Sequence, residues 1–228
     1  LANLTQSPDD AIIVNNNGDK INPCMDLYKA ASSVVYDATN DLSKCYLPFT
    51  DDTNLDPVIV IAGDTSGGTY AESGFTITPS RGSDGTGSYF SVPGKNLTTV
   101  ASNVIVGYRY DFDVTLPKTY FYDGNQRSDY TAALTLARMK FAVGLSGMMG
   151  FKLKIKGRDE WYSINPVVTA DNYLADDVPL DEHSVFTVPI HQRTENTEVR
   201  LFNDSPFPVS LNSMMWEGNY SPRYYRRT

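Results

Sequence analysis

Strict alternation of apolar and polar side chains over strand-length segments is the feature that most constrains this chain. In residues 151–156, Phe, Leu and Ile alternate with three lysines. Between residues 104 and 114, valine, tyrosine and phenylalanine occupy every second position. A period of two places successive side chains on opposite faces of a strand. The patterns predict two amphipathic strands, of which the longer, 104–114, is half-buried.

Further strand-like segments follow at short spacing, separated by turns rich in Gly, Pro and Asn. Residues 58–62, 186–190 and 199–201 have strand character, and 138–143 alternates with its apolar residues inward. Glycines between 143 and 151 favour a hairpin joining 138–143 to the lysine-bearing strand. This pattern predicts a mainly β fold with little helix, made of antiparallel β-sandwich or barrel-like modules with long loops.

Two segments are ambiguous between helix and strand. Leu27, Ala30, Ala31, Val34 and Val35 fit helical spacing, although the last two also suit a strand. Residues 128–135 could form a helix capped by Ser128 or Asp129.

The charge distribution divides the chain in two. The net charge is −8, which disfavours general nucleic-acid binding. Residues 1–115 carry 14 acidic and 6 basic residues, whereas 116–228 carry 13 of each. We therefore expect an acidic β-rich region over 1–115 and a C-terminal β-sandwich-like region over 116–228. Because Leu1 is not an initiator methionine, the chain is expected to be part of a longer protein.

Cys24 and Cys45 are the only cysteines. In a secreted protein such a pair would suggest a disulfide, whereas in a protein assembled in a cytoplasm two buried thiols are the default. The sequence leaves this choice open.

No catalytic or metal-binding constellation is complete. Ser66 lies in a Gly-rich loop similar to the nucleophile loop of trypsin-like proteases, but His183 and His191 both follow it, whereas that family places its histidine earlier. Residues 123–129 resemble a calcium loop without its central glycine and distal glutamate. We expect no enzyme activity, no metal and no cofactor.

The longest uncharged run, 141–151, is too short for a membrane span. Met148 and Met149 fall within it, next to three interrupting glycines. They are interpreted as the apolar tip of the predicted hairpin loop, and the sharper alternative is contact with a partner or a membrane.

The last dozen residues have the composition of a contact surface. Tyr, Trp and Arg are enriched at protein interfaces, and termini seldom hold catalytic centres because they fray unless docked. The predicted subunit or partner contacts are Trp216, Glu217, Gly218, Tyr220, Arg223, Arg226 and Arg227. Since the arginines belong to an acidic protein, carboxylates of a neighbouring subunit are their expected targets.

A family resemblance rests on two segments. An Asn-Asp-Ser-Pro turn at 203–206 leads into Trp216-Glu217-Gly218-x-Tyr220-x-x-Arg223, and 105–110 leads to Leu-Pro at 116–117. Together they resemble the tail nozzle protein, or tail tubular protein B, of short-tailed bacteriophages (podoviruses). The similarity covers roughly 185–228 and 100–117, so the chain would be the C-terminal portion of a longer family member.

This resemblance implies a structural virion protein without catalytic residues. Six copies would form a ring that continues the tail tube, retains double-stranded DNA and then conducts it during ejection. The ring would dock the tail adaptor and tail fibre proteins, and its distal tip would meet the host cell envelope. Such a protein is located in the virion tail and assembled in the host cytoplasm.

Electrostatics supports the conduit idea separately. An acidic lining repels phosphates and lets DNA slide, the reverse of counterion-release binding. We therefore expect lumen residues within 1–115. The three lysines at 152, 154 and 156 are interpreted as a subunit contact or a solvent face.

A secreted β-sandwich binding module, adhesin-like or lectin-like, is the alternative reading. It predicts a Cys24–Cys45 disulfide and an aromatic carbohydrate pocket.

Overall fold

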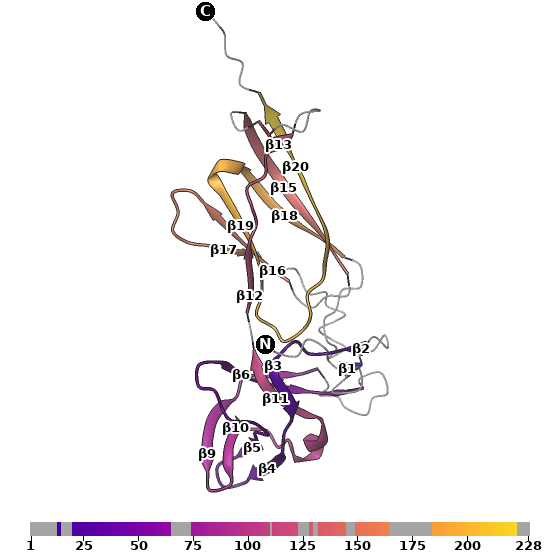
Figure 1. Ribbon diagram of the computed structural model, residues 1–228, viewed down its shortest axis with the longest axis vertical. Helices are drawn as coiled ribbons and strands as arrows, with labels where there is room; N and C mark the ends of the chain where they lie inside the picture. The colour runs from indigo at the N-terminus through magenta and orange to yellow at the C-terminus, as the bar shows by residue number, and fades with distance from the viewer. Residues whose placement is uncertain are drawn as a thin grey trace, which may run out of the picture. The chain divides into compact units, whose positions relative to one another are not determined.

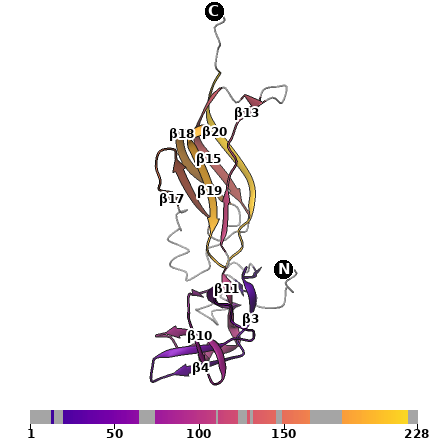
Figure 2. The same ribbon diagram turned by 60° about the vertical axis from the view of Figure 1, so that its left-hand side comes forward.

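The computed structural model describes residues 13–14, 20–64, 74–109, 111–122, 128–129, 132–144, 149–164 and 184–222. The chain forms two compact units (Figures 1 and 2). The first runs to Tyr110 and includes Asp204–Pro208, and the second begins at Asp111. The Cys24 amide donates to the Pro206 carbonyl oxygen within the first unit. The charge step predicts a division after residue 115, so the compact units divide slightly earlier in the chain.

The first unit contains two four-stranded sheets, with strand orders β4-β5-β10-β9 and β3-β11-β6-β8. Their strands are β3 (Asp26–Ala30), β4 (Ser33–Asp37), β5 (Leu42–Tyr46), β6 (Asp56–Ile61), β8 (Thr76–Ile77), β9 (Ser80–Asp84), β10 (Gly87–Pro93) and β11 (Val104–Arg109). A small third sheet joins β1 (Ile13–Val14), β2 (Lys20–Ile21) and β7 (Gly63–Asp64), and η1 (Thr98–Asn103) is a 3₁₀ segment.

Side chains from both four-stranded sheets form one core. Cys45 and Phe90 come from one sheet, Ile59 and Tyr108 come from the other, and all four are 0% exposed. The Phe90 and Tyr108 rings meet edge-on with centroids 5.9 Å apart. This packing makes the first unit a β-sandwich.

The second unit also has two main sheets, with orders β12-β19-β16-β17 and β18-β15-β20. Their strands are β12 (Phe112–Thr115), β15 (Ala133–Val143), β16 (Gly150–Ile155), β17 (Tyr162–Ile164), β18 (Ser184–Arg193), β19 (Thr197–Asn203) and β20 (Leu211–Ser221). The unit also contains the pair β13 (Phe121–Tyr122) and β14 (Ser128–Asp129), and the 3₁₀ segment η2 (Thr194–Asn196).

The core of the second unit lies between its two main sheets. Met139 and Phe141 of β15 pack with Phe151 and Leu153 of β16 in one buried cluster. The Phe141 and Phe151 ring centroids are 4.7 Å apart. The predicted inward faces of 139–143 and 151–155 are thereby confirmed for these residues, and so is the mainly β, sandwich-like fold class.

The predicted hairpin between 138–143 and 151–156 is wrong. β15 belongs to one sheet of the sandwich and β16 to the other, so the connection crosses between layers. Both strands turn an apolar face to the same core, and alternation cannot distinguish partners in one sheet from partners facing across a sandwich.

The predicted continuous strand over 104–114 is also wrong. β11 ends at Arg109 in the first unit, and β12 begins at Phe112 in the second. Residues 104–108 are all buried, so both faces of β11 are covered, and β3 and β6 pair with its two edges. All four residues of β12 are exposed.

Both segments that allowed a helix form strands. The helix-like residues 27–35 fall in β3 and β4, and 133–143 is the long central strand β15. Cross-strand pairing on both sides of β15 outweighs the local capping signal at 128–129.

Candidate contact surfaces

Strand β20 carries the first half of the predicted contact motif. It pairs with β15 over its whole length and lies at the edge of its three-stranded sheet. Trp216 stands opposite Met139 and packs, half-buried, against the core of the second unit. Its indole therefore anchors β20 to the sandwich.

Glu217 faces the other side of the sheet and binds two bases of the neighbouring strand. Its carboxylate oxygens lie 2.5 Å from Arg138 Nε and 2.5 Å from Lys140 Nζ. Hydrogen bonds from Lys140 and Arg138 hold the pKa of Glu217 below its usual value. Sequence reasoning placed both bases outward but missed this pairing, which depends on the register of β15 and β20.

Gly218 is required by close approach of two backbones. A Cβ at this position would overlap the Thr135 carbonyl oxygen. The β15–β20 register shifts between Leu136 and Arg138, next to this contact. Because glycine has no Cβ, the backbones of β15 and β20 can approach each other closely at this bulge.

Tyr220 closes the described part of the motif. Its ring stacks on Phe121 of β13, with centroids 4.1 Å apart and planes inclined by 27°. Tyr220 remains 37% exposed. Arg223, Arg226 and Arg227 lie outside the described residues, so their predicted role stays a prediction.

The rest of β20 is an exposed, apolar sheet edge. Leu211, Met214 and Met215 are 41%, 42% and 56% exposed. No described strand pairs with the outer edge of β20. Long edges of this kind are usually protected by lysine or proline. β20 has neither residue, whereas the opposite edge strand β18 contains Pro189.

The structure corrects the prediction for Met149. Its side chain is 0% exposed and belongs to the core cluster of the second unit. It therefore cannot form an apolar loop tip, because it immediately precedes β16 and packs in the core between the two sheets. Met148 lies outside the described residues.

A second surface lies on the outward face of the β12-β19-β16-β17 sheet, where basic side chains cover aromatic rings. We call it the cation–aromatic face. Its members are Lys152, Lys154, Trp161, Arg200 and Phe202.

The sequence prediction included the lysines but missed Trp161, Arg200 and Phe202. Alternation in β19, with Val199 and Leu201 buried, would have placed Arg200 and Phe202 outward. No periodic signal marks Trp161.

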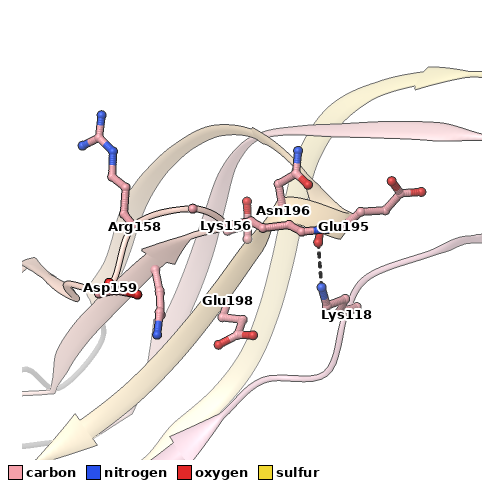
Figure 3. Close-up of a pocket in the computed structure, with 10 residues that line it drawn as sticks. Lys118, Lys156, Arg158, Asp159, Glu195, Asn196 and Glu198 are labelled. Atoms are coloured by element: carbon pink, nitrogen blue, oxygen red, sulfur yellow. Dashed lines mark hydrogen bonds between the residues drawn. The ribbon is translucent and has the colours of Figure 1, made fainter.

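A cleft of about 350 Å³ borders this face. It is lined by four basic residues, Lys118, Lys154, Lys156 and Arg158, and by Asp159, Glu195 and Glu198 together with Gly157, Asn196 and Thr197. Figure 3 shows the Lys118 ammonium directed at the Glu195 carbonyl oxygen, to which it donates at 2.8 Å. The Arg158 guanidinium points away from the other labelled side chains (Figure 3). Mixed charge makes the cleft a candidate protein-contact site more than a small-anion pocket.

The candidate enzyme and metal residues fall largely outside the described residues. This applies to Ser66 and His183, whereas His191 is exposed in β18 with a positive φ of 51°. Among the described residues, no group of three or more His, Cys, Asp or Glu side chains could hold a metal ion. None of the described helical segments is long or apolar enough to cross a membrane.

Cys24 and Cys45 form no disulfide. Burial raises the pKa of the Cys45 thiol to about 12, which leaves it protonated and unreactive. The bridge predicted by the secreted-module reading is therefore absent from the fold.

Comparison with known proteins identifies the family. A family model described as "Bacteriophage nozzle protein" matches residues 2–227. No curated protein matches the chain. The family match extends over both compact units and includes the Trp-Glu-Gly-x-Tyr strand β20. The chain belongs to the bacteriophage nozzle protein family.

Proposed function

We propose that six copies of this bacteriophage tail protein form a nozzle ring that continues the tail tube, retains the genome and then conducts double-stranded DNA during ejection. The ring docks the tail adaptor and tail fibre proteins and meets the host envelope at its distal tip. It assembles in the host cytoplasm. The observation that carries the proposal is the match of residues 2–227 to the nozzle family.

The charge distribution supports passage of DNA through the ring without binding of its phosphates. The first unit, residues 1–110 with 168–179 and 204–208, holds 16 acidic and 6 basic residues, so it supplies the net negative charge of the chain. A negatively charged lining repels DNA phosphates, and this repulsion keeps the duplex moving. We assign the lumen surface to the first unit on this ground.

The exposed edge of β20 is the proposed subunit or adaptor contact. Trp216, Glu217 and Gly218 fix the strand to the sandwich through the core, two ion pairs and a close backbone approach. A strand fixed in this way can present Met214 and Met215 to a partner with little loss of backbone conformational entropy on binding. In this proposal the motif positions the interface, and the exposed methionines and the arginines beyond it form the contact.

Native mass spectrometry of the purified chain tests the ring. A species of six times the 25.3 kDa chain mass is expected. A chain that stays monomeric at all accessible concentrations would refute the proposal.

Charge reversal of Arg223, Arg226 and Arg227 tests their role as contacts with carboxylates of a neighbour. The triple Arg→Glu variant is expected to weaken ring assembly. If it instead changes only DNA passage, the arginines face the lumen and this assignment is wrong.

A further inference from the structure

We propose that the cation–aromatic face of the second unit binds the acidic first unit of a second copy of this chain. The inference rests on the proposed ring and names a surface that would hold neighbouring copies together. It is carried by side-chain geometry, by two lysines without a carboxylate partner among the described residues, and by the charge of the first unit.

Aromatic rings hold the cations of this face in place. Lys152 Nζ lies 4.1 Å from the centroid of the Phe202 ring, and the Arg200 guanidinium carbon lies 4.3 Å from the Trp161 ring centroid. Lys154 Nζ approaches the same indole at 5.8 Å. A cation–π contact uses one side of a cation and leaves N–H donors available for a carboxylate. Side chains ordered in this way lose less entropy when a partner binds.

Lys152 and Lys154 differ from Arg200 in their pairing within the part of the chain that the structure describes. Arg200 pairs with Asp113 at 3.2 Å. Lys152 and Lys154 have no carboxylate oxygen of a described residue within 4.0 Å, even though Glu198 stands opposite Lys154 in the β16–β19 register. Two fixed positive charges therefore face outward from a protein whose net charge is −8.

The first unit supplies the complementary charge. The unit, residues 1–110 with 168–179 and 204–208, holds 16 acidic and 6 basic residues. Asp41 and Asp52 are exposed between strands of this unit, and the Asp56 side chain is 72% exposed although one of its oxygens lies 3.8 Å from Arg109 Nη2. Contact between two different surfaces of identical copies is heterologous, and such contacts form a ring when the rotation between copies closes and an open filament when it does not.

Duplex DNA fits this face less well. Glu198 lies on the same face, and Asp159 and Glu195 line the adjoining cleft. A polyanion would meet these carboxylates as well as the lysines, whereas a protein surface with both signs of charge can match them individually. The interspersed charges therefore favour a protein partner.

Zero-length cross-linking of the wild-type chain tests the contact directly. Carbodiimide joins lysine amines only to carboxylates in contact with them, and a mixture of ¹⁵N-labelled and unlabelled chains marks links between copies. The expected product joins Lys152 or Lys154 of one copy to a carboxylate of the first unit of another. Links between copies that connect other surfaces, without this one, would overturn the inference and leave the ring intact. No links between copies at all would overturn both.

Lys154→Glu provides the matched perturbation, with Lys29→Glu as its control. Both variants change the net charge equally, but Lys29 lies on the acidic first unit. The association constant measured by sedimentation should fall at least about tenfold for Lys154→Glu, because a like charge then faces the acidic partner. Lys29→Glu should show no loss.

Association of Lys154→Glu equal to wild type would overturn the inference. So would a variant that loses retardation of duplex DNA on a gel while its self-association is unchanged, because the face would then be a nucleic-acid surface. The unfolding midpoint checks that each variant is folded. If Lys154→Glu does not fold, the cross-linking of the wild-type chain alone tests the proposed contact.

Discussion

Replacing Gly218 by alanine should loosen β20 from the sheet. The new Cβ would overlap the Thr135 carbonyl oxygen and lie 3.1 Å from Leu136 Cα. Both atoms belong to the backbone of the central strand, so relief requires a shift of one strand against the other. Overpacking of this kind costs about 1–3 kcal/mol. Alanine also restricts the unfolded chain, which offsets about 0.4–1 kcal/mol. The net loss of unfolding free energy is therefore about 1–2 kcal/mol.

Thermal unfolding followed by circular dichroism measures this loss. For a domain of about 60–100 residues, 1 kcal/mol corresponds to about 4–8 °C, so the transition of the second unit should fall by about 4–16 °C. Gly85→Ala is the matched control, because a Cβ at Gly85 meets no atom within 4 Å. It should change stability by less than about 0.5 kcal/mol. A Gly218→Ala protein as stable as wild type would refute the close-approach explanation of the motif glycine.

Three further predictions concern ionisable groups. Glu217→Gln should destabilise the chain at pH 7 and less so at pH 3. The pKa of Glu217 is lowered in the fold, so its stabilisation is present above the unfolded value near 4.5 and is lost as pH falls through the folded value. A difference between the two proteins that is the same at both pH values in urea unfolding would contradict this. Tyr108→Phe should lower the free energy of unfolding, measured with denaturant, by about 1–3 kcal/mol. The Tyr108 hydroxyl donates to Asp51 Oδ1 and accepts from the Asp52 amide, each at 2.7 Å. A loss below about 0.5 kcal/mol would show that these two hydrogen bonds are dispensable. The Cys45 thiol, with its pKa raised to about 12, should resist iodoacetamide at pH 8 until the chain unfolds, and rapid alkylation in the native state, seen by peptide mass, would place it at the surface.

Local alternation in the sequence correctly predicted several strands and their inward faces. Phe141 and Phe151 are both core residues, as their spacing requires. The same spacing could not assign β15 and β16 to different sheets. Alternation requires only that the apolar face of each strand packs against a core, and both arrangements meet that requirement. Partner choice depends on long-range register, which a period of two does not encode.

The strand predicted over 104–114 failed for a related reason. Alternation continues through Arg109 and Phe112, yet the chain passes from one compact unit to the other between them. The apolar character of Ile105 and the missing side chain of Gly107 were the available signals for burial of both faces of β11. A Cβ at Gly107 would lie 2.9 Å from the Asp26 carbonyl oxygen of the neighbouring strand β3.

The candidate surfaces were predictable only in part. Composition and the family resemblance singled out the motif that begins at Trp216. The roles of its residues needed the fold, since Arg138 and Lys140 meet Glu217 only through the register of two strands distant in sequence. In the same way, Trp161 and Arg200 come together because β17 and β19 both flank β16.

Electron cryomicroscopy of the assembled protein tests the central claim most directly. Six-fold particles with an open channel are expected. The carboxylates of the first unit should face the lumen, and the exposed edge of β20 should lie at a subunit or adaptor contact. A reconstruction with a different symmetry, or a six-fold ring whose channel is lined by the basic residues of the second unit, would contradict this claim.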